Sequence, residues 1–191
     1  NVISTVLTRY YNSSSTGSGT SSVAIGNTAT GSGTSSISLG ASSTASATNS
    51  IAIGDNAKAE NYSDTILSSG AIAIGQGAQA KAERAIAIGQ GANVLNHDED
   101  DESISSSKAI AIGDHATAQY DESIAIGSGA TAIGHQTRVS GVEDIPSIAI
   151  GRGATADSTG TISIGVGTVN SIPRSIVIGT GASVVVESEG E

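Results

Sequence analysis

Few side chains in this sequence could do chemistry, and the most distinctive of them lie together. The chain has three histidines, 18 acidic residues and no cysteine. His97 precedes an unbroken acidic run, Asp98–Glu102, whose oxygens would suit a hard cation such as Ca²⁺. The run lacks the glycine and the ligand spacing of a calcium-binding loop. A solvated acidic segment is the simpler interpretation, and we expect no metal.

The remaining candidates for catalysis do not combine into an active site. No nucleophile stands near a positioned base, and His115 and His135 fall in turn-like or irregular segments. The absence of cysteine excludes disulfides and thiolate chemistry. GSGATA at 127–132 and GRGATA at 151–156 match a dinucleotide fingerprint, but that motif needs a helix next, and here a second strand follows. We therefore expect a non-enzyme without a cofactor.

The composition limits the kind of core that can form. The chain has 191 residues and 18.6 kDa, with 25 Gly, four Tyr and no Phe, Trp or Met, so Ile is almost the only bulky side chain. The net charge of −10 argues against binding to nucleic acid or to an anionic membrane. No apolar stretch approaches the roughly 18 residues of a membrane helix. The start at Asn1 resembles that of a processed fragment, so we expect export or anchoring segments elsewhere.

A repeated unit, Ser/Ala-Ile-Ala-Ile-Gly, sets the organisation of the chain. Six of the nine spacings between its closing glycines are 14 residues, and the others are 21, 24 and 24. Longer spacings on a fixed period are typical of loop insertions. The closing glycines are Gly26, Gly40, Gly54, Gly75, Gly89, Gly113, Gly127, Gly151, Gly165 and Gly179.

Each unit predicts two short strands joined by corners. In the segment 147–156, Ile148 and Ile150 alternate with Ala149, which is the period of a strand. Paired glycines then supply a tight corner, and Ala154 and Ala156 alternate with a threonine in a second strand. Fourteen residues make a circuit of only about 46 Å, so the strands must lie nearly back to back. Stacked coils of this kind form a parallel β-solenoid.

We expect the isoleucines to fill the interior against the alanines of the second strand. The small residues between the isoleucines, from Ala24 to Val177, would then face outward and contact neighbouring chains. The expected core ladder consists of Ile25, Ile53, Ile74, Ile88, Ile112, Ile126, Ile150, Ile164 and Ile178.

These residues resemble a known family. NSIAIGDNA at 49–57 and AIAIGQGA at 71–78 and 85–92 are similar to the YadA-like head repeats of trimeric autotransporter adhesins. The resemblance implies a left-handed parallel β-roll of about ten 14-residue coils, assembled as a homotrimer. It also implies display on the bacterial surface beyond the outer membrane, and binding to host extracellular matrix, such as collagen, or to a cell-surface receptor. It covers residues 22–184, with 1–21 expected to be a cap or linker and 185–191 a tail.

Ligand specificity could reside in three insertions. Residues 60–70, 95–107 and 133–146 carry the extra length, all between an alanine-rich strand and the next isoleucine-rich one. They would form a row of loops along one edge, where binding residues often lie. Solvated loops without a role are the alternative. The candidate ligand-binding residues are Tyr62, His97, Asp98, Asp100, His135 and Arg138.

Other repeat proteins remain as rival interpretations. A trimeric phage tail fibre or a structural spacer could use the same roll, and the repeats do not distinguish them from an adhesin. Ice binding would require an unbroken array of threonines. The outward column of the second strand is interrupted by Lys58, Gln79, Asn93 and Val169, so we reject that function.

Overall fold

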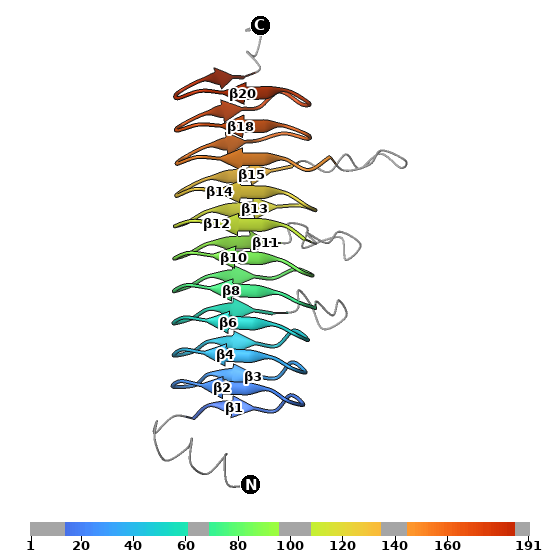
Figure 1. Ribbon diagram of the computed structural model, residues 1–191, viewed down its shortest axis with the longest axis vertical. Helices are drawn as coiled ribbons and strands as arrows, with labels where there is room; N and C mark the ends of the chain where they lie inside the picture. Colours follow the sequence, from blue (N-terminus) through green and yellow to red (C-terminus); the bar gives the residue numbers. More distant parts are fainter. Residues whose placement is uncertain (1–13, 61–68, 96–107, 135–144, 186–191) are drawn as a thin grey trace, which may run out of the picture.

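The computed structural model describes residues 14–60, 69–95, 108–134 and 145–185. Within these ranges the chain is all β, with 21 short strands and no helix. Odd-numbered and even-numbered strands belong to two separate parallel sheets, and the chain alternates between them as it rises along the roll (Figure 1).

The even-numbered strands form a ten-stranded sheet, called here the isoleucine sheet. They are β2 (Val23–Ile25), β4 (Ile37–Leu39), β6 (Ile51–Ile53), β8 (Ile72–Ile74), β10 (Ile86–Ile88), β12 (Ile110–Ile112), β14 (Ile124–Ile126), β16 (Ile148–Ile150), β18 (Ile162–Ile164) and β20 (Ile176–Ile178).

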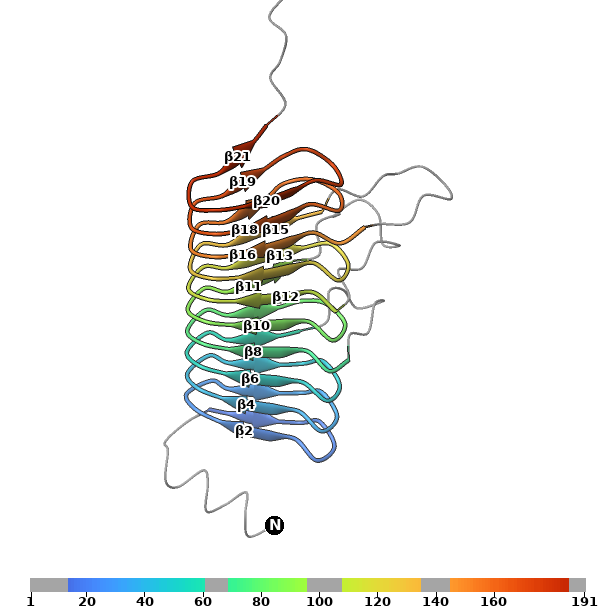
Figure 2. The ribbon, with the colours of Figure 1, turned by 45° about the horizontal axis from the view of Figure 1, so that its top comes forward.

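The odd-numbered strands form an eleven-stranded sheet, called here the polar sheet. They are β1 (Thr16–Gly17), β3 (Thr30–Gly31), β5 (Thr44–Ala45), β7 (Lys58–Ala59), β9 (Gln79–Ala80), β11 (Asn93–Leu95), β13 (Thr117–Gln119), β15 (Thr131–Ile133), β17 (Thr155–Ala156), β19 (Val169–Asn170) and β21 (Ser183–Val184). Figure 2 shows the two sheets facing each other across the roll.

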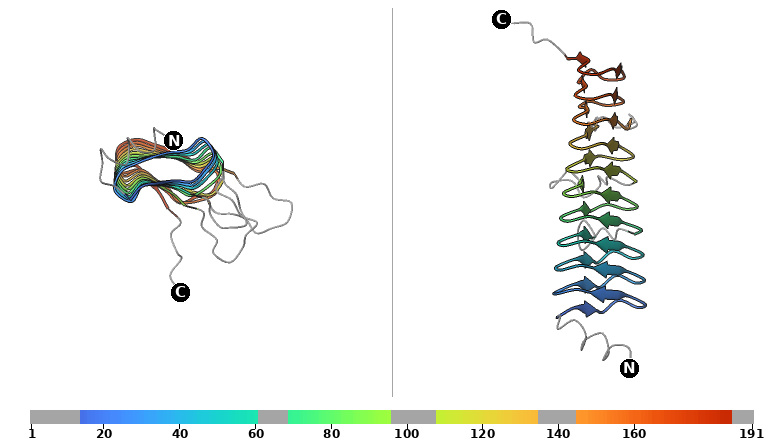
Figure 3. Two further views of the ribbon diagram at one scale, coloured as in Figure 1. Left: turned by 90° about the horizontal axis from the view of Figure 1, so that it is seen from below. Right: turned by 60° about the vertical axis from the view of Figure 1, so that its left-hand side comes forward.

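The coils stack without any slip in register. Ile86 pairs with Ile72 on one side and with Ile110 on the other, although the second partner is 24 residues away. The insertions therefore leave the phase of the repeat unchanged. Seen along the axis, the coils superpose as one flattened ring, and the side view shows an upright stack (Figure 3). The prediction of a parallel β-solenoid is confirmed.

The closing glycine of each coil cannot be replaced by another residue without strain, because its φ is positive and the next coil leaves no room for a side chain. Gly75 has a φ of 132°, which side-chain-bearing residues rarely adopt. A Cβ atom there would lie 2.3 Å from the carbonyl oxygen of Gly89 in the next coil. Two residues further on, the corner again needs a positive φ, supplied by Gly77 at 66° and, in another coil, by His115 at 52°.

The interior is lined by small side chains from both sheets. Ala52, Ala73 and Ala87 of the isoleucine sheet are fully buried, as are Ala59 and Ala80 of the polar sheet. Val94 is the largest apolar side chain among the fully buried residues described. The core is therefore a thin layer of alanine and serine.

The prediction that the isoleucines line the core is wrong. In β8, β10 and β12 the central alanine is buried and both isoleucines are only half-buried. The nine residues of the expected core ladder stand on the outer face: Ile25, Ile53, Ile74, Ile88, Ile112, Ile126, Ile150, Ile164 and Ile178. The small residues between them, which we expected to contact other chains, face the interior instead.

The width of the corner explains this orientation. The amide of Ala78 donates a hydrogen bond to the carbonyl of Gly75 at 3.2 Å, so a β-turn joins the two sheets. A β-turn brings its end residues within about 7 Å, whereas ordinary sheets pack about 10 Å apart. The space between the sheets therefore accommodates alanine against alanine and leaves no room for isoleucine.

One boundary also differs from expectation. The strand β1 pairs with β3, yet it falls within the segment 1–21 that we expected to be a cap or linker. The regular roll thus begins before residue 22. At the other end, β21 is the last strand described, and it ends at Val184.

Candidate subunit-contact and binding surfaces

The outer face of the isoleucine sheet is a continuous apolar surface. Each of its ten strands directs its first and third side chains outward, and the exposed fraction of Ile126 and of Ile150 is 37%. We call this surface the isoleucine face; it carries no charged or polar side chain. Its members are Val23, Ile25, Ile37, Leu39, Ile51, Ile53, Ile72, Ile74, Ile86, Ile88, Ile110, Ile112, Ile124, Ile126, Ile148, Ile150, Ile162, Ile164, Ile176 and Ile178.

Stacking partly covers this face along the roll. An interior isoleucine contacts its copies in the coils above and below, which leaves most of them half-buried. Ile176 and Ile178 have a neighbouring strand on one side only among the described residues, and they are 64% and 69% exposed. The solvent-facing side of each isoleucine has no apolar partner within the described chain.

The outer face of the polar sheet has the opposite character. All but one of its strands present a polar or charged side chain in one column, the exception being Val169, and Lys58 Nζ lies 3.9 Å from Glu60 Oε1 in a surface ion pair. The column consists of Thr16, Thr30, Thr44, Lys58, Gln79, Asn93, Thr117, Thr131, Thr155, Val169 and Ser183. The roll therefore has one apolar side and one water-compatible side.

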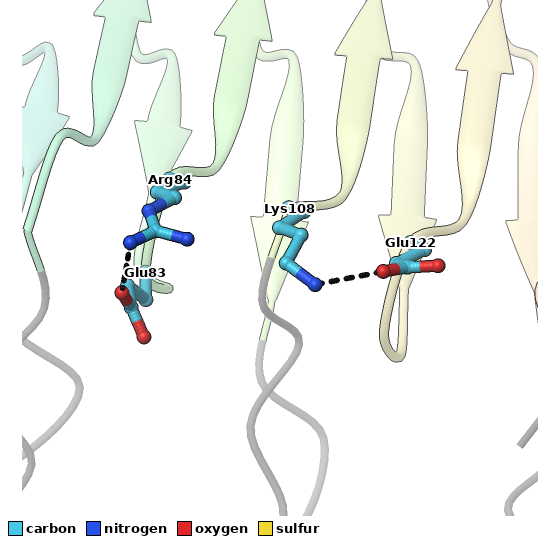
Figure 4. Close-up of polar contacts among 4 residues, drawn as sticks. All are labelled: Glu83, Arg84, Lys108 and Glu122. Atoms are coloured by element: carbon cyan, nitrogen blue, oxygen red, sulfur yellow. Dashed lines mark hydrogen bonds and ion pairs between the residues drawn. The ribbon is translucent and has the colours of Figure 1, made fainter. Parts of the chain in front are cut away.

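Charged residues gather at the corner that leads from the polar sheet to the isoleucine sheet. Arg84, Lys108 and Glu122 occupy the same corner position in successive coils, each with φ between 55° and 61°. Lys108 Nζ lies 2.8 Å from Glu122 Oε1, and Arg84 Nη2 lies 3.5 Å from Glu83 Oε1 (Figure 4). The hydrogen bond from Lys108 to Glu122 is the main cause that raises the pKa of Lys108 above its usual value of 10.5. Sequence reasoning missed this ladder, although the common position of the three residues before the Ile-Ala-Ile segment would have revealed it.

All three insertions leave from this same corner. They separate β7 from β8, β11 from β12 and β15 from β16, so in each case the chain passes from the polar sheet to the isoleucine sheet. The six candidate ligand-binding residues, Tyr62, His97, Asp98, Asp100, His135 and Arg138, lie outside the described residues. Their role remains a prediction.

His115 is the histidine that the structure describes. Its Nδ1 lies 2.8 Å from Asp114 Oδ1, at the corner that follows the closing glycine. Its ring packs against Gly91 of the preceding coil, where a Cβ atom would lie 3.0 Å from the ring. This arrangement agrees with its interpretation as a turn residue.

Two further features can be stated for the described ranges. No group of three or more histidine and acidic side chains there could hold a metal ion. Nor does that part of the chain contain a helix long and apolar enough to cross a membrane.

A comparison with known protein families identifies the repeat. The family model of the YadA head domain repeat (2 copies) matches residues 32–57, 68–92, 105–130 and 146–168, which together make up more than half of the chain. No curated protein matches the chain. The matched segments contain eight of the ten strands of the isoleucine sheet, β4 to β18, each with its closing glycine. The chain therefore belongs to the YadA head domain family, the surface-exposed, non-catalytic adhesin heads of trimeric autotransporters.

Proposed function

We propose that three copies of this chain assemble with their isoleucine faces together, as the head of an adhesin displayed beyond the bacterial outer membrane. The observation that carries this proposal is the contrast between the two outer surfaces. One side presents twenty aliphatic side chains and no polar group, and the other presents threonine, glutamine, asparagine and lysine.

An apolar surface of this length is unusual on a protein that stays monomeric. Burying a fully exposed isoleucine contributes about 1.5–3 kcal/mol, so covering one that is already half-buried contributes a fraction of this, and the same contact recurs in every coil. The isoleucine face is also continuous, because its strands stack in register from β2 to β20. The family to which the chain belongs, the heads of trimeric autotransporters, supports three as the number of chains.

In such an assembly the polar sheet and the charged corner face outward and are available to a ligand. We propose that the ligand is a host extracellular matrix protein or a cell-surface receptor, bound through many weak contacts. Three chains carry three copies of each site, and many heads on one surface multiply the effect by avidity. The insertions after β7, β11 and β15 recur at every second coil and supply the most variable side chains.

A binding experiment with loop replacements tests this function. Residues 60–70, 95–108 and 133–146 would each be replaced by the four-residue connection found at residues 81–84, which preserves the repeat phase. The parent head is expected to bind immobilised collagen, another matrix protein or host cells, and at least one replacement is expected to abolish that binding. The matched control replaces residues 46–49 with the same four residues, and we expect it to bind like the parent.

Two outcomes would count against the proposal. Absence of binding to matrix proteins and host cells by the intact trimer would favour a spacer or a phage fibre. Full binding by a variant lacking all three insertions would exclude the insertions as the ligand site and leave the polar sheet as the candidate.

A further inference from the structure

The isoleucine face has two long edges, and each edge is a different corner of the roll. The chain enters an isoleucine strand from the charged corner, which carries Arg84, Lys108 and Glu122. It leaves the strand through a corner formed by the two residues after each closing glycine, called here the glycine corner. The two corners lie at opposite ends of the flattened ring that the coils form (Figure 3). About 20 Å of extended chain separates them, so their side chains do not meet within one chain.

The glycine corner carries three charged residues in the part of the chain that the structure describes. Asp55 Oδ1 accepts a hydrogen bond from Asn56 Nδ2 at 3.3 Å, and Asp114 Oδ1 lies 2.8 Å from His115 Nδ1. The third residue, Arg152, is exposed, and its guanidinium has neither a hydrogen bond nor an ion pair with any described residue. Arg152 can therefore bind a carboxylate of another molecule.

The proposed trimer brings corners of different chains together, and this inference rests on that proposed function. Three chains related by rotation about an axis parallel to the roll turn their isoleucine faces toward that axis. Each junction in such a ring joins two different edges, the charged corner of one chain and the glycine corner of the next. Rotation leaves every coil at the height that it has in its own chain. Residues of the same coil therefore meet across each junction.

The charges of the two corners are complementary at these heights. Asp114 lies in the coil of β12, as Lys108 does, so a carboxylate is level with a cation. Glu122 lies in the coil of β14, and Arg152 lies in the adjacent coil, that of β16. The residue of the charged corner that is level with Arg152 is Pro146, which has no charge. At the described corner positions, no level brings two carboxylates face to face, or two of the lysine and arginine cations.

We propose that Arg152 of each chain forms an ion pair with Glu122 of the next chain. Lys108 binds Oε1 of Glu122, and the second oxygen of that carboxylate can accept from a guanidinium. Glu122 and Arg152 differ by one coil, which is about 4.8 Å in height. Lys108 and Glu122 also differ by one coil, and they meet at 2.8 Å within one chain, so side chains of this length span the step (Figure 4).

These ion pairs lie at the rim of the interface, beside the isoleucine face. Charged residues at a rim set which surfaces meet, and in what register, more than they set the affinity. The pairs therefore orient the chains around the ring, and the isoleucine face supplies most of the free energy of assembly. Only the edge of the charged corner beside the isoleucine sheet meets the next chain, so its outer side stays exposed.

Cross-linking between two introduced cysteines tests the contact, because the chain has no cysteine of its own. In the variant that combines Glu122→Cys with Arg152→Cys, a short bismaleimide should convert the assembly into a covalent trimer, detected by denaturing electrophoresis. The matched control combines Glu122→Cys with Asn27→Cys, which moves the second cysteine to a distant coil of the same glycine corner. We expect no covalent trimer from the control.

A charge reversal gives a second readout that keeps the chain free of cysteine. Arg152→Glu removes three ion pairs from each trimer and should raise the dissociation constant of the trimer about tenfold at low salt. The effect should fade at about 1 M salt, where charges are screened. Asn27→Glu is the control at the same corner, and it should leave the dissociation constant unchanged.

Two results would overturn the proposal, and they distinguish it from the proposed function. A trimer that is not cross-linked through positions 122 and 152, and that Arg152→Glu does not weaken, would show that other edges meet. The assembly through the isoleucine face would then still stand. A chain that is monomeric in solution would contradict the assembly itself, and the ion pair with it.

Discussion

Ser38 Oγ and Ser43 Oγ lie 2.7 Å apart in the core of the roll and join its two sides. Ser43 donates its only hydroxyl proton to the carbonyl of Gly40 at 2.9 Å, so Ser38 must be the donor to Ser43. The same relationship recurs in a later coil, where Ser163 Oγ donates to Thr168 Oγ1 at 2.8 Å. Where the first position is alanine, as in Ala52, the second is alanine too. At these two facing positions, hydroxyl side chains therefore occur in pairs.

This pairing predicts unequal effects of single substitutions. Ser43→Ala removes the acceptor of a fully buried donor and should lower the free energy of unfolding by about 1–3 kcal/mol. Ser38→Ala leaves the bond from Ser43 to Gly40 intact and should cost less than about 1 kcal/mol. Denaturant titration followed by circular dichroism measures both values.

The double variant is the control for this prediction. Ser38→Ala with Ser43→Ala recreates the pair Ala52 and Ala57 of the next coil, so it should be more stable than Ser43→Ala alone. Additive losses, or a larger loss for Ser38→Ala, would show that the assigned direction of the hydrogen bond is wrong.

The serine pairs also show why the sequence predicted the strands but not their orientation. The alternation in Ile86-Ala87-Ile88 establishes a strand with two unlike faces, and the constant spacing establishes that equivalent residues stack. Neither pattern says which face is interior, because isoleucine suits a core and a subunit interface equally well. The deciding quantity is the distance between the sheets, which the β-turn from Gly75 to Ala78 sets.

A signal for the orientation was nevertheless present in the sequence. Ser38 and Ser163 lie between two large aliphatic residues, and a hydroxyl residue follows each of them five positions later. Such matching is expected only if the two positions touch, which places the small residues inside. The insertions do not follow the 14-residue period, so the sequence does not predict their structure. It predicted only the corner of the roll from which they leave.

The closing glycines should tolerate substitution far less than their corner neighbours. Gly75→Ala would place a Cβ atom 2.3 Å from a backbone oxygen and should cost about 3 kcal/mol or more. Gly77→Ala is the matched control in the same corner, with φ 66° and no atom within 4 Å, and should cost about 1 kcal/mol. Thermal unfolding of the two variants checks this difference, and equal losses would refute the steric role of the stacked carbonyl.

The ion pair between Lys108 and Glu122 should contribute little to the stability of the fold, and only at low salt and while Lys108 is protonated. Both groups are exposed, so Lys108→Met should lower the Tm slightly at low salt, and the effect should fade at about 1 M salt, where screening acts within about 3 Å. The raised pKa of Lys108 means that the contribution is present below the ordinary value of 10.5 and is lost as the pH rises through the folded-state pKa. In the background Glu122→Gln the lysine substitution should have no further effect; a full effect in that background would assign the role of Lys108 to another partner.

The two outer surfaces should respond oppositely to a charge. Ile112→Asp places a carboxylate on the isoleucine face and should dissociate the assembly, because an unpaired charge cannot be buried between chains. Thr117→Asp in the same coil lies on the polar sheet and should leave the assembly intact. Sedimentation velocity distinguishes the two results. Dissociation by Thr117→Asp alone would show that the chains contact one another through the polar sheet, and would contradict assembly through the isoleucine face.

The mass of the unmodified chain in solution, measured by multi-angle light scattering at micromolar concentration, tests the central claim most directly. The account predicts a single species of three times 18.6 kDa, about 56 kDa, with the circular dichroism spectrum of β-sheet. A folded species of 18.6 kDa with the same spectrum would show that the isoleucine face is stable in water, and would contradict assembly through that face.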